Sequence, residues 1–189
     1  EVVYLLYDYF NVPVDRKSAA CLYAALVTDT GGFRYPATTP RTMAIAAELL
    51  ATGIDAPAIG AAIYERRTAA SLRLLGAALA AVKVSADGRL AWITVPLALF
   101  EATGATEEEA EAITEKLREI GGVEALFVAR ESRDGGVRVS LRSKGAMDVN
   151  DVARQFGGGG HVQAAGCTIV KPLAEVEAAL VAALTQALA

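Results

Sequence analysis

Four consecutive glycines, Gly157 to Gly160, followed directly by His161, constrain this chain more than any other stretch. A backbone without side chains reaches left-handed conformations and can turn its N–H groups toward an anion. A flexible linker would be rich in serine and flanked by polar residues, whereas Phe156 and Ala164-Ala165-Gly166 flank this run. The run therefore predicts a phosphate cradle, with a purely structural turn as the alternative.

A short helix should lead into the glycine run. Asp148 has the position of an N-cap with Asp151 three residues on, and the apolar positions share one helical face: Val149, Val152, Ala153 and Phe156. We expect a helix from about Val149 to Phe156, ended by the glycines. It begins close after Arg142-Ser143-Lys144, which should end a strand, so basic residues and glycines can border one pocket.

The residue types around this pocket suit an anionic ligand. Arg142 offers a planar donor fork for phosphate, Ser143 a hydroxyl group and Lys144 a mobile point charge. His161 is the only histidine, which excludes any mechanism that needs two histidines within the chain. A lone histidine is more often structural, but one that follows a glycine cradle can donate to phosphate or titrate near neutrality.

Three segments carry a resemblance to a known family: Arg142-Ser143-Lys144, Asp148-Val149-Asn150, and Phe156 to Gly166 (FGGGGHVQAAG). Together they resemble the DHH-associated substrate-binding domain of the DHH-family phosphoesterases. Within that superfamily they most resemble bacterial oligoribonucleases that also act as phosphatases on 3′-phosphoadenosine 5′-phosphate (pAp). Ala20 to Thr39 resembles the last motif of the catalytic DHH domain, so the resemblance covers essentially the whole chain.

The resemblance implies an α/β fold in two parts. Residues 1–70 would be the mostly helical C-terminal remnant of a DHH catalytic domain with its connecting helices. Residues 71–189 would be a compact DHH-associated domain with a mixed sheet. The helices before the boundary permit a homodimer without requiring one.

The resemblance also implies a manganese-dependent phosphoesterase that hydrolyses short oligoribonucleotides, pAp or both. The resemblance also allows activity on cyclic dinucleotides. Two Mn²⁺ ions in the catalytic lobe would activate water. The substrate-binding residues carried over from the family motif are Arg142, Ser143, Lys144, Gly158, Gly159, Gly160 and His161. Arg34 and Asn150 are further candidates.

Asp29 ends an apolar run just before Gly31-Gly32, where a carboxylate could bind a hard divalent cation. An Asx-turn is the commoner role for such an aspartate. By resemblance Asp29 is one ligand of the manganese pair, but the Asp-His-His motif and the upstream aspartates of the family do not occur here. We therefore expect a truncated chain that is inactive alone and retains at most substrate binding.

The alternative is a non-catalytic nucleic-acid-binding or nucleotide-binding module, as in the related domains appended to alanyl-tRNA synthetases. The segment Thr28 to Phe33 argues against it, because this segment resembles the phosphoesterase lobe. A third possibility is a glycine run that only packs helices. A net charge of −4 and a pI of about 5.1 argue against a protein that coats duplex nucleic acid, and favour a ligand as small as a nucleotide or short oligonucleotide.

Other features indicate a cytoplasmic protein with no membrane partner. No apolar run reaches the ~18 residues of a membrane span, and the N-terminus lacks the positive region of a signal peptide. Cys21 and Cys167 lie in apolar stretches and should both be buried, with no disulfide or zinc site.

The pattern elsewhere predicts helices over residues 1–10, 42–50 and 54–79, with Ile59, Ile63, Leu72 and Leu75 in the core, and leaves 18–27 open between helix and strand. It also predicts a hairpin around Asp87-Gly88, a capped helix from Thr106, and strands over 124–129, 137–141 and 168–170. The strand over 137–141 should alternate, with Val137, Val139 and Leu141 buried and with Arg138, Ser140 and Arg142 on the opposite face. The last segment, Leu173 to Leu188, should be a helix with one apolar side, formed by Val176, Leu180, Leu184 and Leu188.

Overall fold

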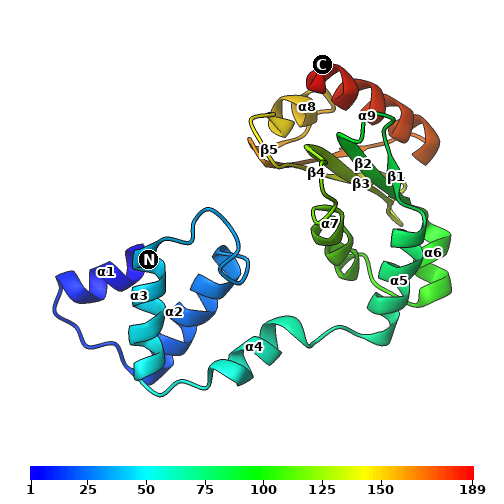
Figure 1. Ribbon diagram of the computed structural model, residues 1–189. Coiled ribbons are helices and arrows are strands. Elements are labelled where there is room, and N and C mark those ends of the chain that lie inside the picture. Colours follow the sequence, from blue (N-terminus) through cyan, green and yellow to red (C-terminus); the bar gives the residue numbers. More distant parts are fainter. The chain divides into compact units, whose positions relative to one another are not determined.

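The computed structural model describes residues 1–189 as two compact units, Glu1–Arg67 and Thr68–Ala189 (Figure 1). The sequence placed the boundary after residue 70. That the first unit belongs to a catalytic domain stays a prediction.

The N-terminal unit consists of four helices: α1 (Val2–Tyr9), α2 (Arg16–Asp29), α3 (Pro40–Ala51) and α4 (Ala56–Tyr64). Capping explains where two of them begin. The Asp15 carboxylate accepts a hydrogen bond of 2.8 Å from the Ser18 N–H and starts α2. Thr39 and Thr42 cap each other's backbone groups at the start of α3. The stretch 18–27, which the pattern left open, is entirely helical.

The core of this unit is small. Five buried residues from α2 and α3 form it: Ala19, Leu26, Ile45, Ala46 and Leu49. None of the residues of α1 is buried, although Tyr4 packs against this cluster. No single helix of the chain is long and apolar enough to cross a membrane; α3 and α4 together have the length and composition of a span, but they are bent by 117° at their junction.

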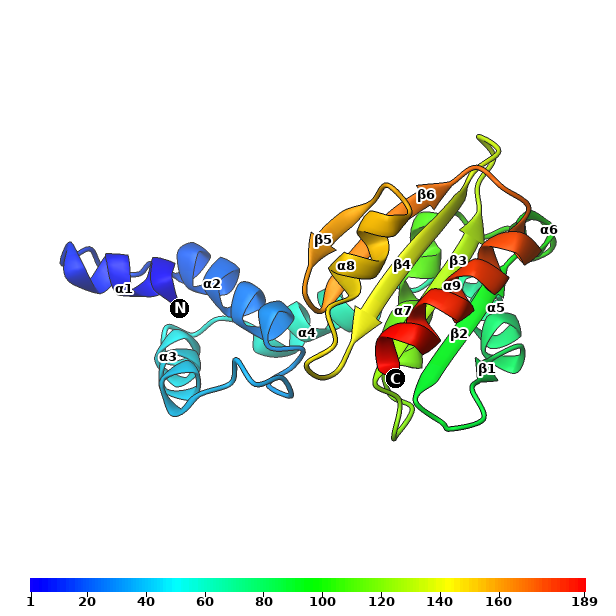
Figure 2. The same ribbon diagram turned by 90° about the horizontal axis from the view of Figure 1, so that it is seen from above.

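The C-terminal unit is a six-stranded sheet with helices on both faces (Figure 2). Its strands are β1 (Lys83–Val84), β2 (Leu90–Val95), β3 (Ala125–Glu131), β4 (Val137–Ser143), β5 (Gly159–His161) and β6 (Ala164–Ile169). They lie in the order β1-β2-β3-β4-β6-β5, and only β2 and β3 run parallel. The prediction of a mixed sheet in an α/β unit is confirmed.

Two layers of helices cover the sheet. One face packs against α8 (Val149–Gln155) and α9 (Leu173–Leu188), the two helices in front of the strands in Figure 2. The other face packs against α5 (Ala69–Ala80), α6 (Leu97–Thr103), the short 3-10 helix η1 (Glu108–Ala110) and α7 (Glu111–Leu117). As predicted for α9, one stripe is buried: Val176, Leu180, Leu184 and Leu188.

Five local predictions were wrong or incomplete. Ile59 and Ile63 are not core residues, because α4 contains no buried residue. Leu72 is 53% exposed, because α5 turns Leu74 and Ala78 into the core instead. Cys21 is exposed, whereas Cys167 is buried as expected. The last strand begins at Ala164 rather than residue 168. At Thr106 only half of the capping box forms: the Glu109 carboxylate accepts the Thr106 N–H at 2.9 Å.

Candidate functional site

The first glycines of the run end helix α8. The Gly157 N–H donates to the Arg154 carbonyl at 3.1 Å, and the Gly158 N–H donates to the Ala153 carbonyl at 2.9 Å. With φ of +73° at Gly157, these two bonds form a Schellman motif, which closes a helix with a left-handed residue. The left-handed glycine that the sequence indicated is therefore present, and its role is to end the helix.

The remaining glycines lie in an edge strand rather than in an open loop. Gly159–His161 pair antiparallel with β6, and Val162-Gln163 form the two-residue turn between the strands. A Cβ atom at Gly158 would lie 2.1 Å from the Gly166 carbonyl oxygen, and one at Gly160 would lie 2.6 Å from the Ala165 Cα. The expectation of a loop cradle is thus corrected: the glycines let β5 approach β6 closely.

The turn of this hairpin is bound to the end of β4. The Ser143 N–H donates to the Gln163 carbonyl at 3.2 Å, and the Ser143 hydroxyl donates to the Val162 carbonyl at 3.4 Å. The Val162 carbonyl also accepts the Val149 N–H at 2.9 Å, at the start of α8. The motif residues of β4, α8 and β5, which are up to 19 residues apart in sequence, are therefore brought together at one end of the unit.

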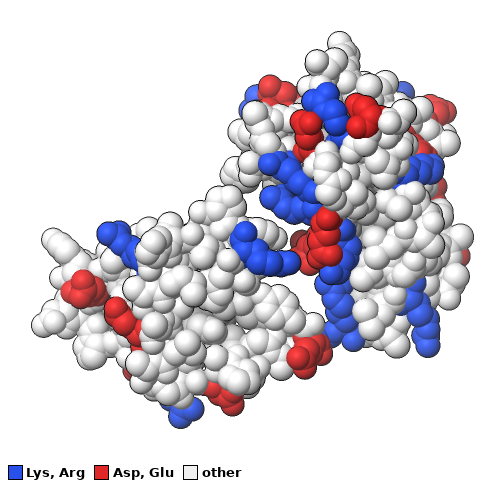
Figure 3. Space-filling view, viewed as in Figure 1, with Lys and Arg blue, Asp and Glu red and all other residues white.

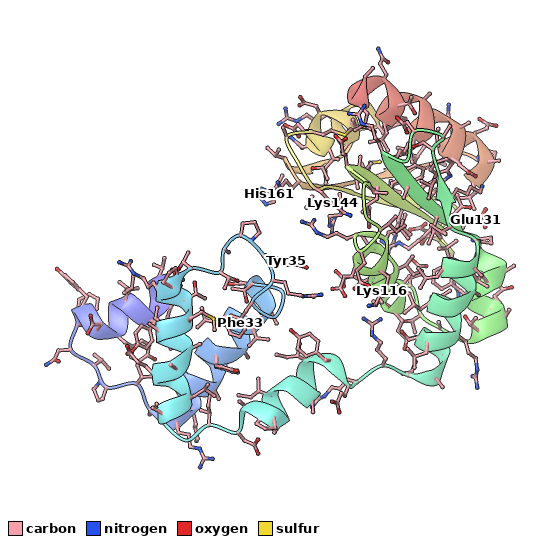
Figure 4. All side chains as sticks on the ribbon, viewed as in Figure 1. Phe33, Tyr35, Lys116, Glu131, Lys144 and His161 are labelled. Atoms are coloured by element: carbon pink, nitrogen blue, oxygen red, sulfur yellow. The ribbon has the colours of Figure 1, made fainter.

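The basic side chains at this end differ in how they are held. Arg142 is half-buried, and its Nη1 donates to the Leu141 carbonyl at 2.9 Å, which leaves the rest of the guanidinium fork for a ligand. The Lys144 amine donates to the Ile120 carbonyl at 2.5 Å, and burial, with a smaller contribution from Arg118, lowers its pKa. His161 is exposed and projects from the edge strand (Figure 4).

Ser143 differs from Arg142, Lys144 and His161 in its burial and its contacts. It is fully buried, and its hydroxyl and N–H both bind the hairpin turn. In this arrangement Ser143 holds the hairpin on β4 rather than facing a ligand. Its predicted contact with substrate stays a prediction that the geometry does not favour.

The two further candidates lie in different units. Asn150 is 9% exposed at the start of α8, and a Cβ atom at Gly159 would lie 3.7 Å from its Oδ1, so Asn150 lies beside β5. Arg34 belongs to the N-terminal unit, where its Nε donates to the Gly31 carbonyl at 2.7 Å. Arg34 thus closes the loop that follows α2.

The predicted metal ligand, Asp29, is the last residue of α2 and is exposed. The loop after it has a definite conformation, since Gly31, Gly32 and Phe33 all have positive φ and the buried Thr30 hydroxyl accepts the Phe33 N–H at 2.9 Å. The chain contains no group of three or more His, Cys, Asp or Glu side chains that could bind a metal ion. A single carboxylate does not make a manganese site, so the residues of this chain alone do not fit the two-metal centre.

Two cavities of the C-terminal unit lie away from the glycine run. One, of about 390 Å³, is lined by residues of α6, of the segment that follows it and of η1, including Glu101, Glu107 and Glu108. The other, of about 520 Å³, lies beside the β3–β4 turn and includes Lys171 and Glu131. Three carboxylates and a single guanidinium, that of Arg133, give the first cavity an excess of negative charge, and neither cavity is lined by Arg142 or His161. The candidate site lies at the end of β4 and β5, where Arg142 is half-buried and His161 is exposed.

Comparison with known proteins assigns the family. Residues 91–189, just over half of the chain, match the DHHA1 domain family. The chain belongs to this family of DHH-associated domains, as its motifs predicted.

Two curated relatives are similar to most of this chain. The chain is 34% identical over 165 residues to the bifunctional oligoribonuclease and PAP phosphatase NrnA of Thermus thermophilus, and 32% identical over 173 residues to NrnA of Bacillus subtilis. The alignments cover 87% and 89% of this chain, but 48% and 54% of the relatives. The chain thus spans about half the length of these two proteins.

A solved structure agrees with the fold. The exopolyphosphatase-related protein from Bacteroides fragilis superposes with a TM-score of 0.86 at 29% identity, covering 91% of this chain and 51% of that protein. The similarity therefore extends beyond the DHHA1 residues into the N-terminal unit.

Proposed function

We propose that this chain is the nucleotide-binding half of a phosphoesterase that hydrolyses short oligoribonucleotides and pAp. The names of the two NrnA relatives support the substrate class. The structural observation that carries the proposal is the docking of the β5–β6 turn on Ser143. His161 then lies in the same row as Arg142, with Ala164 of β6 between them, and Lys144 follows the end of β4.

Each of the three side chains has a distinct role in this proposal. The guanidinium fork of Arg142 binds two oxygens of a terminal phosphate. The Lys144 ammonium, held by the Ile120 carbonyl, adds a fixed positive charge. The exposed His161 donates a hydrogen bond from its ring N–H. Such a site holds and orients an anion and carries no group that attacks phosphorus.

We further propose that the intact enzyme uses Mn²⁺ and that Asp29 is one of several ligands. The proposal rests on the resemblance of the segment around Asp29, since this chain provides no metal cluster of its own. We expect no phosphate release from pAp when this chain is incubated with Mn²⁺. Turnover comparable to that of a full-length NrnA would contradict this expectation.

Thermal melting with and without pAp tests the binding role. A ligand present at 100 times its dissociation constant stabilises the fold by about 2.7 kcal/mol. We expect this stabilisation for the wild-type chain and its loss in Arg142→Ala and His161→Ala. Arg73→Ala, an exposed position on α5, is the matched control and should retain it. No shift for the wild type, or equal shifts in all variants, would refute the proposal.

A further inference from the structure

One face of the sheet is only partly covered. On this face Leu126 and Val128 of β3 pack under α5, α6 and α7, and the buried cluster that they join contains no residue of β4. The strand β4 instead alternates: Val137, Val139 and Leu141 enter the core formed with α8 and α9, and the intervening side chains are polar. Of these polar side chains, Arg138 is exposed, and Ser140 and Arg142 are half-buried.

The register across three strands shows how this uncovered face is organised. Residues directly opposite each other in an antiparallel pair lie on the same face. One row contains Arg130, Arg138 and Thr168, the next Val128, Ser140 and Gly166, and the third Leu126, Arg142 and Ala164.

Arginines therefore stand at both ends of the exposed part of β4. Between these two arginines lies the row of Val128, Ser140 and Gly166. Val128 is covered by the helices, and Ser140 and Gly166 are small. Arg138 and Arg142 are four residues apart, which is roughly 13 Å along an antiparallel strand. That distance exceeds the reach of a single phosphate group.

The end of the face away from Arg142 holds two like charges side by side. Arg130 lies directly opposite Arg138, an arrangement that is unfavourable in a sheet. Arg138 is 3.2 Å from an Asp134 carboxylate oxygen and 3.4 Å from one of Glu107.

Arg130 has no carboxylate within salt-bridge distance. Its Nη2 donates to the Ser140 hydroxyl at 3.1 Å, and its Nε is buried without a partner. Burial lowers the pKa of Arg130, although the more distant Glu111 and Glu107 oppose this effect.

An arginine pair with an unmatched donor is a poor structural element, because a buried donor without an acceptor costs free energy. An anion beside Arg130 and Arg138 would relieve the repulsion between the two guanidinium groups. Lys and Arg side chains gather in groups on the C-terminal unit (Figure 3).

We propose that Arg130, Arg138 and Ser140 form a second phosphate subsite, which holds an inner phosphodiester of a short single-stranded RNA whose terminal phosphate lies at Arg142. The subsite rests on the proposed function. It makes these residues determinants of substrate length: an RNA of several nucleotides reaches both ends of the face, whereas pAp, with one nucleoside, occupies only the Arg142 end.

Calorimetric titration of the 189-residue chain with pAp and with a 5′-phosphorylated RNA tetranucleotide tests this subsite. Arg130→Gln and Arg138→Gln should each weaken RNA binding roughly tenfold, the contribution of one charged hydrogen bond, and leave pAp binding unchanged. For RNA, the slope of log K against log salt should fall by about 0.7 for each phosphate group that a variant no longer neutralises. Arg73→Gln removes the same charge from α5 and should change neither affinity. Thermal melting without ligand shows whether each variant is folded. If Arg130→Gln is misfolded, Arg130→Lys replaces it in the titrations.

The outcomes separate the two proposals. If the wild type binds neither ligand, the proposed function fails and the subsite fails with it. If the wild type binds both but the two variants bind RNA as tightly as the wild type, or lose pAp and RNA equally, only the second subsite is refuted.

Discussion

Replacing Gly158 by alanine should destabilise the C-terminal unit although the substitution deletes no side chain. The added Cβ would lie 2.1 Å from the Gly166 carbonyl oxygen and 2.5 Å from the Cys167 Cβ. Neither neighbour can move freely, because β6 is paired on both sides, with β4 and with β5. Overpacking of this kind costs about 1–3 kcal/mol of unfolding free energy.

Urea denaturation followed by tryptophan fluorescence measures the unfolding free energy of the C-terminal unit, because this unit contains the tryptophan. Trp92 is the only tryptophan and stacks on Phe127 in the sheet, with ring centroids 6.1 Å apart. Gly145→Ala is the matched control, since its Cβ would meet no atom within 4 Å and its φ is not positive. The reasoning would be refuted if Gly158→Ala unfolded at the same urea concentration as Gly145→Ala, because close approach of β5 and β6 would then not require the glycine.

Two further predictions concern the helix cap and an ion pair. Asp148→Ala should cost about 0.5–2 kcal/mol of unfolding free energy in the same assay, since the Asp148 carboxylate accepts the N–H groups that start α8; full stability of the variant would contradict this role. The second prediction concerns Glu177, whose carboxylate accepts hydrogen bonds from Lys83 and Trp92. Burial raises the pKa of Glu177, but these two hydrogen bonds lower it more, so the net shift is downward. A lowered folded-state pKa contributes stability at neutral pH that is lost as pH falls through it. Below about pH 4.3 the wild type should therefore lose its advantage over Glu177→Gln, and a constant difference across pH would contradict the assignment.

The sequence was informative where local chemistry decides the structure. The apolar period of α9, the Asp148 cap and the alternation of β4 are short-range signals, and all three are present as predicted. Cys21 and Leu72 were misplaced because both lie in helices that are apolar on more than one side, so composition alone could not identify the buried stripe.

The residues of the candidate site were predicted from the sequence, but the backbone structure that carries them was not. Four glycines before a histidine permit a loop or an edge strand equally well, and only the pairing with β6 selects the strand. The opposition of Arg130 and Arg138 depends on the register of β3 on β4, which is a long-range property. The alternation of Arg138, Ser140 and Arg142 was the one available signal for the open face, and it gave no indication that Arg130 stands beside them.

The location of the bound nucleotide is the central claim, and amide chemical-shift mapping of the isotope-labelled chain with pAp tests it most directly. The account predicts that the perturbed amides cluster at Arg142 to Lys144 and Gly159 to Gln163, and that Arg142→Ala abolishes the changes. Perturbations centred on the cavity beside Glu101 and Glu107, with those two segments unaffected, would contradict it.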